Sequence, residues 1–158
     1  MTMMKGMLAG VVVLFSVSAA IAEEKAAPPA KPANAVMIPA ADLKWSDVPN
    51  FPGLKMAVAK GDPMKGASHF FIKFPAAFAA PVHHHTADHS VVVLSGTLTL
   101  SVDGKDTKLP AGSFFNFTKK QKHGTTCDAG AECLIFVDGR GKWDVVVPTD
   151  KTKAAAPK

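Results

Sequence analysis

The sequence holds 158 residues, of which 47% are hydrophobic and 20% charged, and its formal net charge is +5. This length suits a single domain that can bury a core. Much of the excess positive charge lies in alanine- and proline-rich segments near the two ends, and no nucleic-acid-binding motif is present, so we interpret the charge as a solubility feature and expect no nucleic-acid partner.

The first 22 residues have the pattern of a secretory signal peptide. Lys5 precedes an apolar run over residues 8–17, and residues 20–22 form an A-x-A cleavage site. The run is too short for a transmembrane helix, and no other stretch is long and apolar enough to cross a bilayer. We therefore expect a periplasmic or secreted protein with no membrane span once the signal is removed.

The rest of the chain divides into three parts. Residues 23–39 form an Ala/Pro-rich linker, residues 40–147 a folded domain and residues 148–158 a disordered basic tail.

Within the domain, short runs alternate between apolar and polar residues and are separated by turn signals. Strands are predicted over 54–59, 69–74, 91–94, 97–102, 105–109, 113–117, 123–127, 133–137 and 143–147. Asp103-Gly104 predicts a tight hairpin, and 123–127 and 133–137 are expected to form the arms of another. Strands of this length, closely spaced and without a convincing helix, indicate an all-β sandwich or barrel.

The only two cysteines, Cys127 and Cys133, are separated by five residues. In an oxidising compartment a close pair flanking a turn predicts a disulfide. The alternative is two soft metal ligands or a redox couple, which the spacing favours less because it is not C-x-x-C.

Four of the six histidines lie within residues 83–89. Side chains alternate along a strand, so His83 and His85 point to one face and His84 to the other, and a locally irregular path returns His89 to the first face. His123 begins another strand-like run. Converging imidazoles favour a divalent metal ion, whereas the alternative is a histidine-rich surface patch that binds metal loosely.

Other polar and aromatic residues are candidates for the lining of a pocket or for support of the ligands. They are His69, Phe71, His84, Asp88 and Phe115. For His69 a structural or surface role is an equal alternative, and Asp88 lies beside His89 but points to the other face.

The histidine segment resembles the first motif of the cupin superfamily, G-x5-H-x-H-x3,4-E-x6-G. His83 and His85 match its histidine pair and Gly96 matches its closing glycine. His89 stands where the family has glutamate, and the opening glycine is replaced by alanine.

The second cupin motif, G-x5-P-x-G-x2-H-x3-N, is matched in part. Gly112 and His123 occupy the first glycine and the histidine, whereas Thr118 and Lys120 replace the proline and the second glycine, and Cys127 replaces the asparagine. The resemblance covers roughly residues 54–147.

The resemblance implies a jelly-roll barrel (a double-stranded β-helix) around one divalent ion, which could be Fe, Zn, Mn, Ni or Cu. His83, His85 and His123 would be ligands, and His89 would be a fourth ligand or turned away. It implies an oxygenase-like enzyme acting on a small chelating substrate, either an enolisable diketone or a phenol. The alternative is a non-catalytic module that holds structural zinc or binds a small molecule. A homodimer is also expected from the resemblance. Because imidazoles are neutral, such an ion keeps its full charge and favours an anionic, chelating ligand or hydroxide.

Overall fold

The protein is described here from a computed structural model, which covers residues 35–148. The predicted signal peptide, all but the end of the predicted linker and all but the first residue of the predicted tail lie outside this range. Between residues 35 and 148, no helix is long and apolar enough to span a membrane.

The described residues fold into strands, preceded by a single 3-10 turn over Ala40–Asp42. The strands are β1 (Trp45–Asp47), β2 (Lys55–Gly61), β3 (Ser68–Phe74), β4 (Ala79–His83), β5 (His89–Ser95), β6 (Thr97–Val102), β7 (Lys105–Pro110), β8 (Phe114–Phe117), β9 (His123–Cys127) and β10 (Cys133–Gly139). The prediction of an all-β domain is confirmed.

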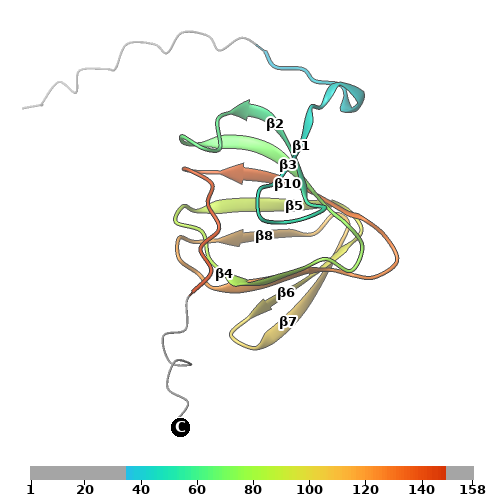
Figure 1. Ribbon diagram of the computed structural model, residues 1–158, viewed down its shortest axis with the longest axis vertical. Coiled ribbons are helices and arrows are strands. Elements are labelled where there is room, and N and C mark those ends of the chain that lie inside the picture. Colours follow the sequence, from blue (N-terminus) through green and yellow to red (C-terminus); the bar gives the residue numbers. More distant parts are fainter. Residues whose placement is uncertain (1–34, 149–158) are drawn as a thin grey trace, which may run out of the picture. The chain divides into compact units, whose positions relative to one another are not determined.

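Two antiparallel sheets make up the domain. One has six strands in the order β1-β2-β3-β10-β5-β8, and the other has four in the order β4-β9-β6-β7. Figure 1 shows β2, β3, β10, β5 and β8 stacked in this order, with β6 and β7 lying at an angle below them. Strands distant in sequence are neighbours in both sheets, as in a jelly roll rather than a simple meander.

The core lies on the inner faces of the sheets and follows from residue alternation. Along β3 buried and half-buried residues alternate at every position, which places Phe70, Ile72 and Phe74 inside. Phe70 from the six-stranded sheet and Leu98 from the four-stranded sheet are both fully buried. Burial of each such side chain contributes about 1.5–3 kcal/mol.

The predicted turn at Asp103-Gly104 is confirmed, since β6 pairs with β7 and both turn residues have positive φ, 51° and 77°. Two other expectations are wrong. Residues 123–127 and 133–137 do not pair with each other, because β9 lies between β4 and β6 while β10 lies between β3 and β5. Residues 143–147 form no strand and make only one bridge, between Val146 and His84.

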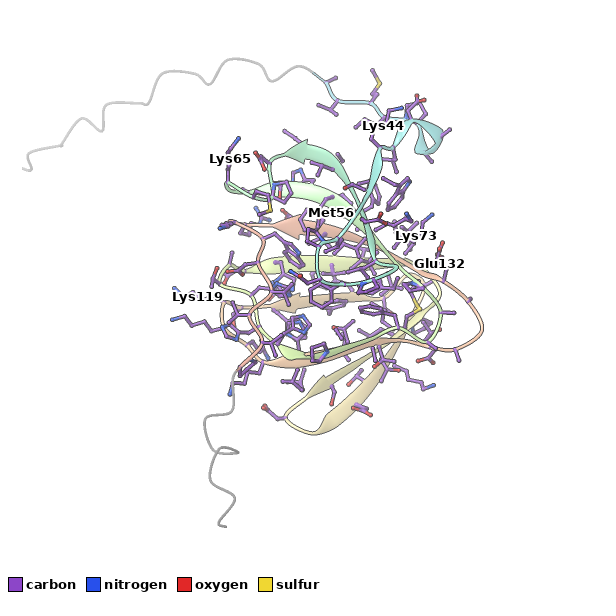
Figure 2. All side chains as sticks on the ribbon, viewed as in Figure 1. Lys44, Met56, Lys65, Lys73, Lys119 and Glu132 are labelled. Carbon is purple, nitrogen blue, oxygen red and sulfur yellow. A yellow bond between two sulfur atoms is a disulfide. The ribbon has the colours of Figure 1, made fainter. Side chains whose placement is uncertain are left out.

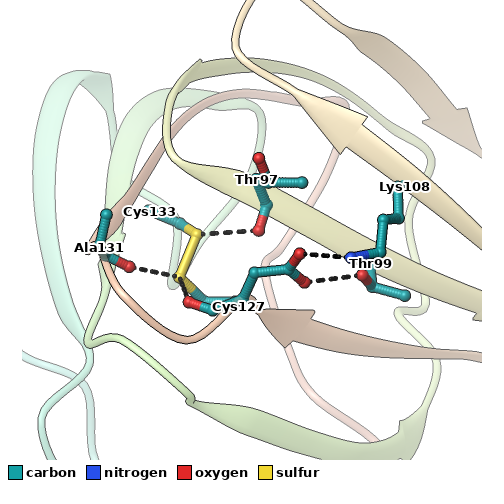
Figure 3. The surroundings of a disulfide bond; sticks show 7 residues. Thr97, Thr99, Lys108, Cys127, Ala131 and Cys133 are labelled. Carbon is teal, nitrogen blue, oxygen red and sulfur yellow. Dashed lines mark hydrogen bonds and ion pairs between the residues drawn. A yellow bond between two sulfur atoms is a disulfide. The ribbon is translucent and has the colours of Figure 1, made fainter.

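The disulfide between Cys127 and Cys133 is present and joins β9 to β10, so it links the two sheets (Figure 3). Both cysteines are fully buried, and Cys133 Sγ lies 3.3 Å from the carbonyl oxygen of Thr97. Gly96 packs against this bond, because a Cβ built there would come within 2.8 Å of Cys133 Sγ. Its φ of +75° also favours glycine.

Candidate metal centre

The pairing of β4 with β9 brings together two of the predicted ligands. His83 ends β4 and is paired in register with His123, which begins β9, and their ring centroids are 4.4 Å apart. The ladder is irregular between Ala80 and His83, where Pro81 has no N–H to donate. This irregularity sets the register that places the two rings side by side.

His85 follows β4 in a short loop that is held from several sides. The backbone N–H of Lys120 donates to the carbonyl oxygen of His85 at 2.8 Å. The carboxylate of Asp144 accepts hydrogen bonds from the backbone N–H and the hydroxyl of Thr86, at 2.9 and 2.8 Å. These contacts fix the position of His85 relative to both sheets.

His83, His85 and His123 form one group whose potential ligand nitrogens all lie within 4.8 Å of one another. The three residues are buried, with 3–6% of their surface exposed. Metal–nitrogen bonds of about 2.0–2.1 Å place two ligand nitrogens at most about 4.2 Å apart, and the limit observed for this group is close to that spacing. The group fits the donor set and the spacing of a metal site.

Backbone carbonyl groups select one tautomer of each ring in this group. Nδ1 of His83 lies 2.8 Å from the carbonyl oxygen of Pro81, and Nδ1 of His123 lies 3.0 Å from that of Gln121. Nδ1 of His85 makes a short contact with the carbonyl oxygen of Asp144. A carbonyl oxygen can only accept, so each Nδ1 carries the proton and each Nε2 keeps a free lone pair. This arrangement is the usual support of metal-binding histidine.

His89 lies beside the group but is not part of it. Its ring centroid is 4.7 Å from that of His85 and 6.1 Å from that of His123. Nδ1 of His89 is buried without a hydrogen-bond partner among the described residues. The backbone carbonyl group of Ala87 raises the pKa of His89, by less than burial lowers it, but it makes no hydrogen bond to Nδ1. His89 is therefore available as a fourth ligand.

Burial keeps the four imidazoles neutral. Desolvation lowers the pKa of His85 to about 3 and that of His123 to about 4. It also lowers the pKa values of His83 and His89. Neutral rings at physiological pH offer lone pairs to a cation without competition from protons.

The histidines form part of the wall of an otherwise apolar chamber between the sheets. Trp143 stacks on His85 at a centroid distance of 4.0 Å, and Phe117 stacks on His123 at 4.1 Å. These rings fix the imidazoles from behind. Within the part of the chain that the structure describes, Thr125 is the only lining residue with a polar side chain apart from histidine and Trp143, and no lining residue is aspartate, glutamate, lysine or arginine.

The other predicted site residues differ in whether they line the chamber. Phe115 lines the chamber, as expected. His69 and Phe71 do not, because the inner face of β3 is the one that carries Phe70 and its neighbours, and these two lie on the opposite face. His69 instead contacts the carboxylate of Asp138 at 3.3 Å. Neither residue therefore lines the chamber, and the position of His69 agrees with the structural or surface role that was its alternative.

His84 and Asp88 also lie outside the chamber lining. His84 makes backbone hydrogen bonds to Val146, and its half-buried side chain is not a member of the three-histidine group. The carboxylate of Asp88 accepts a hydrogen bond from the backbone N–H of Lys119 at 2.7 Å and so supports the neighbouring loop.

Two residues that matter at this site carried no signal in the sequence. Trp143 was assigned to a last strand, and nothing in its surroundings indicated a contact with His85. Asp144 acts on His85 through its backbone carbonyl oxygen, a group that every residue possesses.

Comparison with known proteins gives one family match. A family model described as "Domain of unknown function (DUF4437)" matches residues 13–146. A search of curated proteins finds no match.

Solved structures of cupins share the fold. The polyketide cyclase RemF from Streptomyces resistomycificus superposes with a TM-score of 0.62 at 17% identity, covering 72% of this chain and 87% of its own. KdgF from Halomonas sp. gives 0.55 at 19% identity, covering 65% and 91%. An RmlC-like cupin from Shewanella frigidimarina gives 0.53 at 24% identity, covering 64% and 86%. At these identities the likeness establishes the fold.

Proposed function

We propose that this chain, which belongs to the DUF4437 family and shares its fold with solved cupin structures, is a metal-dependent, oxygenase-like enzyme acting on a small chelating substrate. The observation that carries this proposal is the three-histidine group on the wall of an apolar chamber. Catalytic metal sites keep open positions beside three protein ligands, whereas structural sites are closed. The chamber offers space on the side where such positions would be needed.

His83, His85 and His123 would hold the ion through their Nε2 atoms. When bound, a divalent ion supplies Lewis-acid polarisation of a chelating pair of oxygens and, for iron or copper, access to O2 chemistry. The carbonyl groups behind each Nδ1 keep the rings aimed at one point. His89 would supply a fourth nitrogen or leave its place to the substrate.

The stacked rings of Trp143 and Phe117 protect this arrangement. They cover two of the imidazoles and so exclude water from the ligand shell. A dry site strengthens the interaction of the ion with its substrate.

A second candidate is a periplasmic or secreted binding protein with a structural zinc ion. One observation favours it: no aspartate or glutamate lines the chamber, so no carboxylate is placed to accept a proton from a substrate. If His89 closes a four-histidine shell, the ion has no open position and no turnover follows.

Oxygen consumption by protein loaded with Fe²⁺ separates these two functions. We expect uptake of O2 with small diketones or phenols, lost in His83→Ala and retained in His84→Ala, whose side chain lies outside the group. A protein that holds stoichiometric Zn²⁺, depends on it for folding stability and consumes no O2 in the Fe²⁺ form would establish the binding function instead.

A further inference from the structure

The lining of the chamber restricts what the proposed site can bind. We propose that its ligand is uncharged in solution and largely apolar, with only a few non-hydrogen atoms beyond those that contact the ion. This inference rests on the proposed function, since it concerns the same metal site. It distinguishes a small diketone from dicarboxylates, sugar acids and multi-ring phenols.

The first argument is the chemistry of the walls. Hydrophobic side chains from both sheets surround the space in front of the histidines, including Ile72, Val91, Leu98 and Ile135. Among residues 35–148, no lysine, arginine, asparagine or glutamine lines it. A ligand carboxylate that is not bound to the ion would therefore lose its hydration and gain neither an ion pair nor a charge-assisted hydrogen bond, which costs several kcal/mol.

The charged residues of the domain lie elsewhere. Figure 2 shows Lys65 and Lys119 at one end of the sheets and Lys73 and Glu132 at the other. Lys73 lies 3.5 Å from the carboxylate of Glu132, and its ammonium group is 4.6 Å from the ring centroid of Trp45. It therefore faces away from the chamber, on the outer side of the six-stranded sheet.

The second argument is size. The cavity has a volume of about 60 Å³, which is enough for only a few water-sized groups. A 1,3-diketone with short substituents is among the smallest chelating ligands, whereas a flavonol has several times more atoms. Phe51 and Phe78 also line the chamber, with ring centroids 6.4 Å apart.

Both demands on the ligand are met by an enolisable diketone. The charge of an ion bound by neutral imidazoles favours an anion, while the walls disfavour one. A diketone enters uncharged and is acidic enough beside a cation to lose one proton to solvent. A dicarboxylate carries its charges into the chamber from the start.

Two probes of nearly the same shape test this inference on the Zn²⁺-loaded protein, in which no turnover complicates binding. 2,4-Pentanedione and malonate present the same 1,3-dicarbonyl chelate and differ by two methyl groups in place of two charged oxygens. Their affinities are measured by titration calorimetry and compared with those for free Zn²⁺ in the same buffer, which removes the intrinsic preference of the ion. We expect the protein to shift this preference toward 2,4-pentanedione by at least tenfold.

Met56 provides a way to reverse the shift. It is half-buried on β2, faces the chamber opposite Ile72 in the ladder and is labelled in Figure 2. Met56→Arg brings a guanidinium group to the lining, so malonate should gain affinity at unchanged Zn²⁺ stoichiometry. Met56→Leu is the matched control and should keep the wild-type preference.

The outcomes separate this inference from the proposed function. A Zn²⁺-loaded protein that binds malonate as well as 2,4-pentanedione, or binds neither probe, would overturn the inference and leave the metal site standing. Failure of the wild-type protein to bind Zn²⁺ would overturn the proposed function, and this inference with it.

Discussion

Four buried neutral histidines make the metal-free protein sensitive to acid. Desolvation lowers the pKa of His85 to about 3 and that of His123 to about 4, whereas in the unfolded chain both titrate near 6.5. As the pH falls below 6.5 the unfolded state binds more protons than the folded state. The free energy of unfolding therefore decreases as the pH falls through this range. The contribution of the neutral histidines to stability is fully present only above pH 6.5.

The size of the effect follows from the same values. Each histidine that is neutral when folded and protonated when unfolded lowers the free energy of unfolding by about 1.4 kcal/mol per pH unit. Between pH 6.5 and pH 5, His85 and His123 together account for a loss of about 3 kcal/mol, because each is only half protonated in the unfolded chain at pH 6.5. His83 and His89, whose pKa values are also lowered, add to it. A domain with a total stability of about 5–15 kcal/mol loses much of it.

Urea denaturation of the metal-free protein in the presence of chelator, at pH 7, 6 and 5, measures this loss. The aspartates with lowered pKa values, Asp62 and Asp128, titrate below this window and do not contribute. His123→Gln should reduce the loss by about 2 kcal/mol, because it removes one of the two imidazoles with the most strongly lowered pKa values. Stability that is constant or rises from pH 7 to pH 5 would refute the account of buried neutral imidazoles.

Three further predictions follow from contacts in the structure. Binding of Cu²⁺ or Ni²⁺ should quench the fluorescence of Trp143, which stacks on His85. The variant Trp143→Phe should lose this quenching, and Trp45→Phe should retain it. Equal quenching in both variants would place the ion elsewhere. The double variant Cys127→Ala and Cys133→Ala should have a free energy of unfolding that is about 2 kcal/mol lower in urea denaturation. The expected loss is modest because the loop that the disulfide closes is short. An unchanged denaturation midpoint would contradict this. Gly96→Ala should lower the free energy of unfolding by more than about 2 kcal/mol, since its Cβ would meet the backbone of Glu132 and Cys133. Gly104 has a similar positive φ but open space around it, so Gly104→Ala should lower it by only about 1 kcal/mol. Equal losses in the two variants would count against the steric argument.

The strands and the histidine group could be predicted because local patterns encode them. Alternation predicted the inner face of β3 as Phe70, Ile72 and Phe74, and Asp103-Gly104 specified its hairpin. The spacing of His83 and His85, together with His123 far along the chain, indicated three histidines whose potential ligand nitrogens the structure brings within 4.8 Å of one another. That these three bind a metal stays a prediction.

The rest depends on contacts between distant segments. The pairing of β9 and β10 with strands of different sheets is decided by the whole topology, so the expected hairpin between them did not form. The packing of Trp143 on His85 and the carbonyl of Asp144 behind Nδ1 depend on how residues 140–146 cross the barrel end. Alternation divides β3 into two faces but does not say which one a pocket uses, so the sequence left the placement of His69 and Phe71 open.

Several predictions lie beyond the described residues or need a second molecule. The signal peptide over residues 1–22, export to the periplasm or outside the cell, and the homodimer stay predictions. Size measurements on the protein in solution and mass analysis of its mature N-terminus test them.

The central claim is that His83, His85 and His123 hold one divalent ion. The most direct test is the metal content of the purified protein after equilibration with excess divalent ion and removal of the unbound fraction, with His83→Ala and His84→Ala measured beside it. We expect close to one ion per chain in the wild type and in His84→Ala, and almost none in His83→Ala. Absence of bound metal in the wild type, or equal loss in the two adjacent variants, would contradict the claim.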